Sequence, residues 1–190
     1  MDNLRIDYLR LLEGWVPSAR AWLHSPRDRS DLLYYGDGTN GWGMQTTQKA
    51  LAAFAVLADE PELDARRAGL SRNELLARSL AMLRYSLATH LSGDYHTTDS
   101  DTFRWGHTWI SALGVERMMP GVEALWPHMT PDDHARLRAM LLSESEWLLN
   151  EYPVVADPVD LRRNHPESNM WNGAILWRTA LLYPDAPAAA

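Results

Sequence analysis

Three segments of the chain concentrate the side chains that can do chemistry. Residues 34–43, 94–107 and 160–172 each mix aromatic rings with glycine or proline and with hydrogen-bonding groups. Histidine and tyrosine can transfer protons, arginine and asparagine can bind an anion, and tryptophan offers a flat apolar surface to a sugar ring. On this basis the candidate site residues are Trp42, Tyr95, Arg104, Trp105, His107, Arg163, Asn169 and Trp171.

The elements that must position these residues are helices. Strand patterns are scarce, whereas apolar residues recur at helical spacing in six blocks. Ser71 with Glu74 forms a capping box, and Thr130 before Pro131 is a typical helix start. We expect helices over about 4–23, 45–58, 71–90, 105–119, 130–152 and 168–183.

The six predicted helices are of two kinds. The first, third and fifth are amphipathic, whereas the second, fourth and sixth are apolar nearly all round. A helix that is apolar on every side must be covered on every side. We therefore predict an all-α fold in which outer amphipathic helices alternate with inner buried ones, as in an α/α toroid or α-hairpin solenoid.

The length of the chain limits how much of such a toroid it can build. A closed toroid of six hairpins needs roughly twice this length, judged from the size of one helical hairpin. Residues 1–190 are therefore expected to form a single domain that is an incomplete or truncated toroid. If the chain is complete, a homo-oligomer could close the ring.

In this arrangement every connection from an outer to an inner helix emerges at the same end. The N-termini of the three inner helices point to that end, each equivalent to about half a positive charge. Such termini favour an anion, for example a carboxylate, and Arg104 and Arg163 would add to the local field. The overall charge of the protein does not forbid this, because the field in a cleft is local.

Composition narrows the possible functions. The 190 residues include 18 basic and 25 acidic side chains, a net charge of −7, which argues against nucleic-acid binding. The absence of cysteine excludes thiol catalysis, disulfides and cysteine-bound zinc. No segment approaches the ~20 apolar residues of a membrane span, and no leader pattern opens the chain. We expect a cytoplasmic protein, or a secreted one if a leader was removed, without a cofactor.

The motif Arg163-Asn164-His165, before a buried helix in an α-hairpin chain with tryptophan-rich connections, resembles a known family. It is similar to the heparinase II/III-like and alginate-lyase-like polysaccharide lyases. The resemblance implies an α/α toroid followed by β-sheet domains, and cleavage of uronic-acid polysaccharides by β-elimination. It also implies that Asn164 neutralises the uronate carboxylate beside His165. The segment 164–169 departs from the usual continuation of the motif.

The reaction implied by this resemblance makes defined chemical demands. Removing the proton next to a carboxylate requires donors for the developing charge, worth ~3–4 kcal/mol each. A base then takes the proton and an acid protonates the leaving oxygen. The catalytic candidates are Asn164 (with Arg163 or Arg104) as donor, His107 or His165 as base, and Tyr95 as acid.

Each of these roles has a structural alternative. Trp42, Trp105 and Trp171 open buried helices, so they can pack in the core instead of stacking on sugar rings. His107 can serve as a structural hydrogen-bonding group, Tyr95 as a loop anchor, and Asn164 and Asn169 as cap residues. The tryptophans predicted within helices, and therefore in the core, are Trp109, Trp147 and Trp177.

Other functions remain open. A glycoside hydrolase would need two carboxyl groups ~5–10 Å apart, and the candidates are Asp94, Asp99, Asp101 and Glu167. A third possibility is a non-catalytic scaffold that binds a glycan or a protein. No metal is expected, because the spacing of His96, Asp99, Asp101 and His107 matches no established ligand pattern. The glycines of 36–41 lack the strand and lysine of a phosphate loop. The preferred hypothesis is an enzyme acting on an anionic oligo- or polysaccharide.

Overall fold

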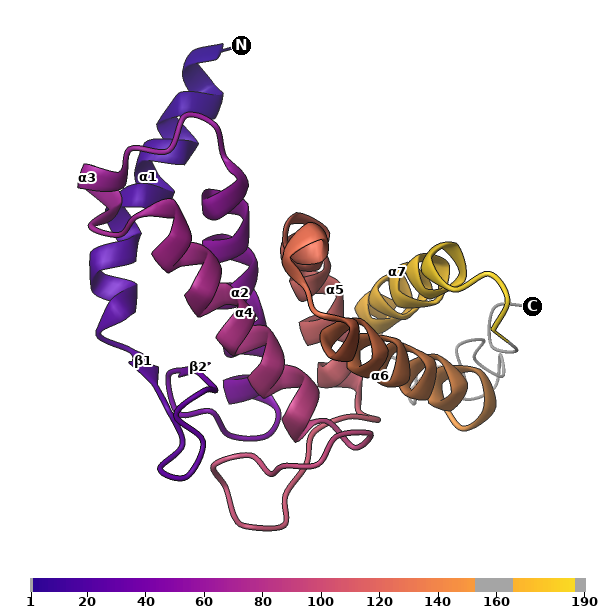
Figure 1. Ribbon diagram of the computed structural model, residues 1–190. Helices are drawn as coiled ribbons and strands as arrows, with labels where there is room; N and C mark the ends of the chain where they lie inside the picture. The colour runs from indigo at the N-terminus through magenta and orange to yellow at the C-terminus, as the bar shows by residue number, and fades with distance from the viewer. Residues whose placement is uncertain (1, 153–165, 187–190) are drawn as a thin grey trace.

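The chain is built mainly of helices (Figure 1). This computed structural model describes residues 2–152 and 166–186. The long helices are α1 (Asp2–Arg20), α2 (Trp42–Asp59), α4 (Arg72–Thr89), α5 (Trp109–Leu125), α6 (Pro131–Asn150) and α7 (Pro166–Leu182). The short elements are α3 (Ala65–Ala68), the 3-10 helix η1 (Trp126–His128) and the antiparallel pair β1 (Leu23–His24) and β2 (Tyr34–Tyr35). The prediction of an all-α fold is confirmed.

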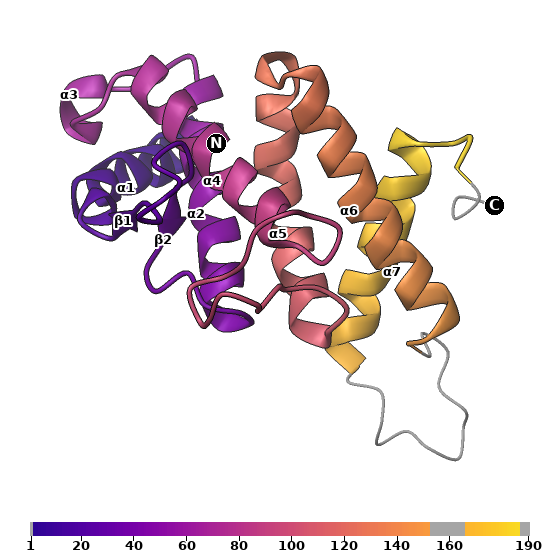
Figure 2. The ribbon, with the colours of Figure 1, turned by 60° about the horizontal axis from the view of Figure 1, so that its bottom comes forward.

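The helices that are apolar nearly all round follow one another in space. α2 packs mainly against α5 and α4, and α5 in turn packs against α7. We call α2, α5 and α7 the central row. The amphipathic helices α4 and α6 contact each other and lie along one side of this row, while α1 contacts α2 and α3 (Figure 2). The helices apolar nearly all round are thus neighbours of one another in space.

The contact between α2 and α5 depends on two glycines of α5. A Cβ atom added at Gly121 would lie 2.5 Å from the Cα atom of Ala52, and one added at Gly114 would lie 1.8 Å from the Oε1 atom of Gln48. Both distances are far below van der Waals contact. Any side chain at either glycine would therefore force the two helices apart or displace Gln48.

The predicted helix caps are confirmed. Ser71 and Glu74 exchange their side-chain and backbone hydrogen bonds, and Thr130 forms a second capping box with Asp133. Pro131 occupies the first turn of α6, where its missing N–H is not needed.

The start of α5 differs from the prediction by four residues. Trp105 does not open the helix, because its N–H is donated to the carbonyl of Thr89 (3.0 Å) and its carbonyl accepts the N–H of Leu91 (2.9 Å). These two bonds hold Trp105 alongside the end of α4. The chain then turns through Gly106 and His107, both with positive φ, before α5 begins at Trp109.

One proline, Pro120, does not end its helix as the sequence suggested. Pro120 lies within α5, which was expected to end there, and Pro17 lies within α1. A proline removes only one backbone donor, and beyond Pro120 the buried side chains of Val122 and Leu125 still pack in the core. Continued burial therefore outweighs the loss of one hydrogen bond.

α7 is not covered on every side, so the prediction of full burial is wrong for this helix. Met170, Trp177 and Leu181 are exposed, Trp177 to 65%. The buried face instead includes Ser168 and Asn172. Among the described elements, α7 packs mainly against α5 and α6. The rest of its apolar surface is in contact with solvent.

The two ends of the helical layers differ. Figure 1 shows the connections 21–41 and 90–108 together at one end, which we call the rim, and the connections 60–71 and 126–130 at the other. This confirms that the connections before α2 and α5, where the candidate residues are concentrated, emerge on the same side.

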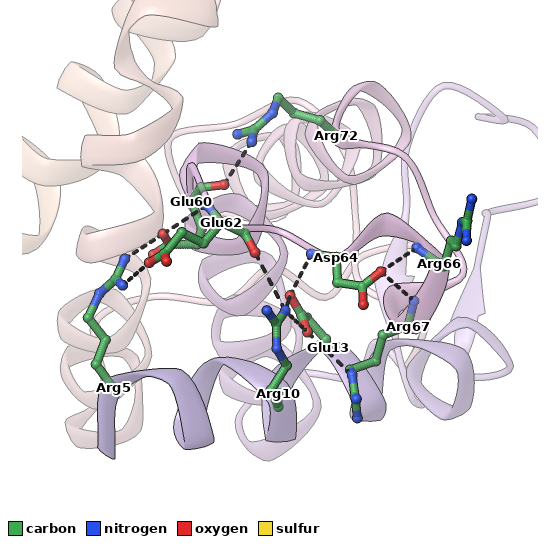
Figure 3. A network of polar contacts seen from close by, with 9 residues as sticks. All are labelled: Arg5, Arg10, Glu13, Glu60, Glu62, Asp64, Arg66, Arg67 and Arg72. Atoms are coloured by element: carbon green, nitrogen blue, oxygen red, sulfur yellow. Dashed lines mark hydrogen bonds and ion pairs between the residues drawn. The ribbon is translucent and has the colours of Figure 1, made fainter. Parts of the chain in front are cut away.

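The end opposite the rim is fastened by ion pairs (Figure 3). The carboxylate of Glu13 in α1 is fully buried. It lies 2.7 Å from the Nη1 atom of Arg10, 3.7 Å from the Nε atom of Arg67, and accepts the N–H of Asp64 at 2.7 Å. Arg5 pairs with the carboxylates of the segment that follows α2. These contacts join α1 to the segment between α2 and α4.

Candidate functional site

Three tryptophans form a row near the N-terminal ends of the central helices. Trp42 is the first residue of α2, Trp109 is the first residue of α5, and Trp171 lies in the second turn of α7. The ring centroids of Trp42 and Trp109 are 6.0 Å apart in an edge-on arrangement, and those of Trp109 and Trp171 are 6.5 Å apart and nearly parallel. We call these residues the tryptophan row.

The tryptophan row presents aromatic surface to solvent. Trp42 is 62% exposed, Trp109 is 43% exposed, and Trp171 is half-buried. Large exposed aromatic rings that lie next to one another are unusual on a soluble surface and typical of a binding site. Because indole rings pack well against the C–H faces of sugars, the row has the chemistry of a glycan platform.

Trp105 belongs to the core instead. It is 2% exposed, its indole N–H is donated to the carbonyl of Ser86 at 2.8 Å, and its ring lies edge-on against His90 at 4.7 Å. The structure thus matches the packing alternative for Trp105. Trp109, which was expected in the core, occupies the exposed position, because α5 begins four residues later than predicted.

A buried carboxylate at the rim connects the end of α4 to the start of α5. Glu144 of α6 is fully buried and accepts hydrogen bonds from the N–H of His107 (2.8 Å) and the hydroxyl of Ser111 (2.9 Å). Its Oε1 atom also lies 3.0 Å from the Nε2 atom of His90. A carboxylate of the chain itself therefore bonds to the residue before the cap of α5 and to a side chain of its first turn, beside the N-terminus that was expected to favour an anionic ligand.

His107 is fixed by contacts with α6. Its Nε2 atom lies 3.0 Å from the Oγ atom of Ser143, and its ring stacks on Trp147 at 5.5 Å with an angle of 2° between the planes. The backbone at His107 has a φ of 52°, which a non-glycine residue rarely adopts. These contacts are those of a structural hydrogen-bonding residue, and they hold the ring of His107 in one orientation.

Tyr95 anchors one rim connection to another. Its hydroxyl donates a hydrogen bond to the Oδ1 atom of Asp28 at 2.5 Å, and its ring stacks on His96 at 4.3 Å. Burial, together with the hydrogen bond to Asp28, raises the pKa of Tyr95 to about 12. The phenol therefore stays protonated at neutral pH, as a general acid must, while its geometry is that of a loop anchor.

The remaining candidates lie apart from one another. The Nη1 atom of Arg104 donates to the carbonyl of Gly93 at 2.9 Å, and the guanidinium is exposed. Asn169 is half-buried, and its Oδ1 atom has no hydrogen-bond partner within the described ranges. The positions outside the described residues are Arg163, Asn164 and His165. The structure thus brings Trp42 and Trp171 together through Trp109, while Tyr95 and His107 contact different elements.

Two of the carboxylates considered for hydrolysis have structural partners. Asp94 forms a bidentate pair with Arg136 at 2.9 and 3.0 Å, and this pairing lowers the pKa of Asp94. Asp99 accepts the N–H of Asn40 at 3.1 Å. Within residues 2–152 and 166–186, no three histidine, aspartate or glutamate side chains cluster closely enough to hold a metal ion.

Comparisons with known proteins add no further constraint. No family model, curated protein or solved structure matches this chain. None of the helices in the described ranges is long and apolar enough to cross a membrane. The function must therefore be argued from the geometry of the rim.

Proposed function

We propose that this chain is a carbohydrate-active domain that binds an anionic oligo- or polysaccharide along the tryptophan row. We further propose that it is an incomplete α/α toroid and acts as a polysaccharide lyase on glycans that contain uronic acids. The observation that carries the proposal is the row itself, in which Trp42, Trp109 and Trp171 succeed one another across three helices.

The row suits a polymer better than a small ligand. Its rings come from α2, α5 and α7, so a bound chain would cross the ends of all three helices. The N-cap of α2 is Gly41, which provides no side-chain hydrogen bond to the first turn. The Oδ1 atom of Asp37 already lies at this turn, 2.1 Å from where a Cβ atom at Gly43 would be, so the proposed binding depends on the rings of the row and not on this helix end.

The proposed reaction rests on the sequence resemblance. In it, Asn164 with Arg163 or Arg104 neutralises the uronate carboxylate, and His107 or His165 removes the adjacent proton. Tyr95 protonates the leaving oxygen. The raised pKa of Tyr95 does not itself favour the last role, because a general acid works best with a pKa near the operating pH.

A two-channel assay tests the proposal. The purified chain is mixed with a panel of uronate polysaccharides, and ultraviolet absorbance of an unsaturated product is followed together with tryptophan fluorescence. A lyase gives both an absorbance increase and a fluorescence change. A fluorescence change without product retains glycan binding and overturns the lyase. Reducing ends released without absorbance favour a hydrolase, and no change in either channel across the panel overturns the whole proposal.

A further inference from the structure

We infer that the rim holds a second saccharide site in the cavity between segments 25–34 and 95–101, which is lined by Tyr95, the proposed acid, but by none of the tryptophans of the row. This cavity has a volume of about 690 Å³, within the range of about 300–1,000 Å³ that is usual for small-molecule sites. Its residues fit a neutral sugar unit better than an acidic one. The inference rests on the proposed function in one respect, the choice of a saccharide as the class of ligand.

The two walls of the cavity are fastened to each other. The hydroxyl of Tyr95 on one wall donates to the carboxylate of Asp28 on the other at 2.5 Å. At the base, the N–H of Thr98 donates to the carbonyl of Gly38 at 3.3 Å, and the hydroxyl of Thr98 donates to the carbonyl of Asp37. A cavity with walls fixed in this way loses little conformational entropy when a ligand binds.

Aromatic rings form one side of the cavity. Tyr34, Tyr85 and Tyr95 all line it, and the rings of Tyr34 and Tyr85 are 5.2 Å apart. Tyr85 is fully buried and its hydroxyl donates to the carbonyl of Gly38 at 2.7 Å, so this ring is fixed in place. Tyr85 itself offers no face to a ligand, so the half-buried ring of Tyr34 is the surface that can pack against the apolar face of a pyranose.

Uncommitted polar groups stand beside these rings. The hydroxyl of Ser25, the guanidinium of Arg27 and the carboxylate of Asp101 line the cavity, and none of them takes part in a hydrogen bond or ion pair with any described residue. The Nδ1 atom of His96 is directed to the carbonyl of Thr97 at 2.9 Å, which leaves Nε2 available. Together they supply both donors and acceptors, as the hydroxyl groups of a sugar require.

The charge of the lining selects against acidic sugars. Asp28 and Asp101 bring two negative charges against the single positive charge of Arg27. Asp28 is ionised at neutral pH, because the hydrogen bond from Tyr95 lowers its pKa. A carboxylate ligand would meet net repulsion, whereas a neutral sugar would not. The cavity thus complements the tryptophan row, for which we propose an anionic glycan.

Saturation-transfer NMR on the full chain tests this inference. The probes are the methyl α-glycosides of glucose, galactose and mannose, with methyl α-glucuronoside as the charged control. We expect saturation transfer to at least one neutral glycoside, and binding of the glucuronoside at least about threefold weaker. If none of the neutral glycosides receives saturation, or if the glucuronoside binds best to the Trp42→Ala variant, in which the row is disrupted, the inference is overturned.

Variants locate the signal. Arg27→Ala and Asp101→Ala change exposed, unpaired side chains, and each is expected to weaken the neutral glycoside about three- to tenfold by removing one hydrogen-bonding group. Asp101→Asn removes one negative charge, so it should reduce the difference in affinity between the neutral glycosides and the glucuronoside. The matched control Trp42→Ala should leave the glycoside signal unchanged.

The same variants separate this inference from the proposed function. If Trp42→Ala abolishes the glycoside signal while the cavity variants do not, the cavity is not the site, although glycan binding on the row stands. If the glycoside signal follows the cavity variants but no uronate polysaccharide changes the tryptophan fluorescence, the proposed function fails and the cavity site stands.

Discussion

The rim and the opposite end of the same helices use their side chains in different ways. At the opposite end, Arg5, Arg10 and Arg67 are joined to carboxylates (Figure 3). At the rim, large aromatic rings such as Trp42 and Trp109 face solvent, and a cavity retains unpaired polar groups. The ion-paired end is thus opposite the end for which we propose binding, a division found where binding residues lie on loops held by a rigid scaffold.

Glu144 lies at the rim but contributes to stability, because it is buried there and joins α4, α5 and α6. Glu144→Ala should cause the largest loss of stability, about 3–5 kcal/mol, because the groups of His90, His107 and Ser111 lose their buried acceptor. Urea denaturation at pH 7 measures the loss. Glu144→Gln keeps the shape and one acceptor, and should cost clearly less. Equal stability of all three proteins would contradict this role.

Glu13 is the buried carboxylate at the opposite end, so its substitution can be compared with that of Glu144. Glu13→Ala should lower the free energy of unfolding by about 3 kcal/mol, because the N–H of Asp64 and the guanidinium of Arg10 lose a buried partner. Arg5→Ala is the control; its ion pairs are exposed and screened by solvent, so it should cost much less stability than Glu13→Ala. Fluorescence titration with a uronate polysaccharide should be the same for both variants. A weakened titration would break the proposed division between the two ends.

The pH dependence of stability sharpens the comparison further. Burial alone would raise the pKa of Asp133, but hydrogen bonds from Arg84 and Thr130 outweigh it, so the pKa is lowered. The stability from this group is present above the unfolded pKa of about 4 and is lost as the pH falls through the folded value below it. Asp133→Asn should cost about 2 kcal/mol at neutral pH.

The cost of Asp133→Asn should shrink as the pH is lowered from 7 to 3. At low pH the carboxyl of the wild-type protein becomes protonated and loses the stability that its ionised form provides. Chemical denaturation of both proteins at several pH values measures the difference. A difference that stays constant over this range would show that the ionised carboxylate of Asp133 is not the stabilising form.

The smallest expected effect concerns the tryptophan row. Trp42→Ala should weaken polysaccharide binding by about 0.5–1.5 kcal/mol, the value of one aromatic contact, and should change stability by no more than about 0.5 kcal/mol. Trp22→Ala removes an equally exposed ring outside the row and should leave the affinity unchanged. Calorimetric titration with the polysaccharide measures the affinity of both variants. Equal losses in the two variants would mean that the row has no special role in binding.

Local patterns predicted the helices well, since caps and periodicity depend on residues only a few positions apart. The capping boxes at Ser71 and Thr130 are examples. The start of α5 was misplaced because Trp105 bonds to the end of α4, a contact that periodicity does not reveal. Thr108 and Ser111, three residues apart, form the true capping box. That pair was the available signal, and it would have placed Trp109 at the helix end.

Contacts between distant segments could not be predicted from spacing. Tyr95 meets Asp28, and Glu144 meets His90, because whole helices bring these residues together. The cavity and the buried carboxylate were missed for this reason. The row was found in part, since the positions of Trp42 and Trp171 at helix starts were evident from the sequence.

The two glycines of α5 give this architecture a recognisable signature. Gly114 and Gly121 are seven residues apart, facing Gln48 and Ala52, which are four apart on α2. A chain that keeps this helix spacing can vary most of its surface, but it needs glycine at 121 against the backbone of Ala52, and at 114 unless Gln48 moves. Distant relatives should therefore be identifiable by this paired pattern on consecutive apolar helices, even where the rim has changed beyond recognition.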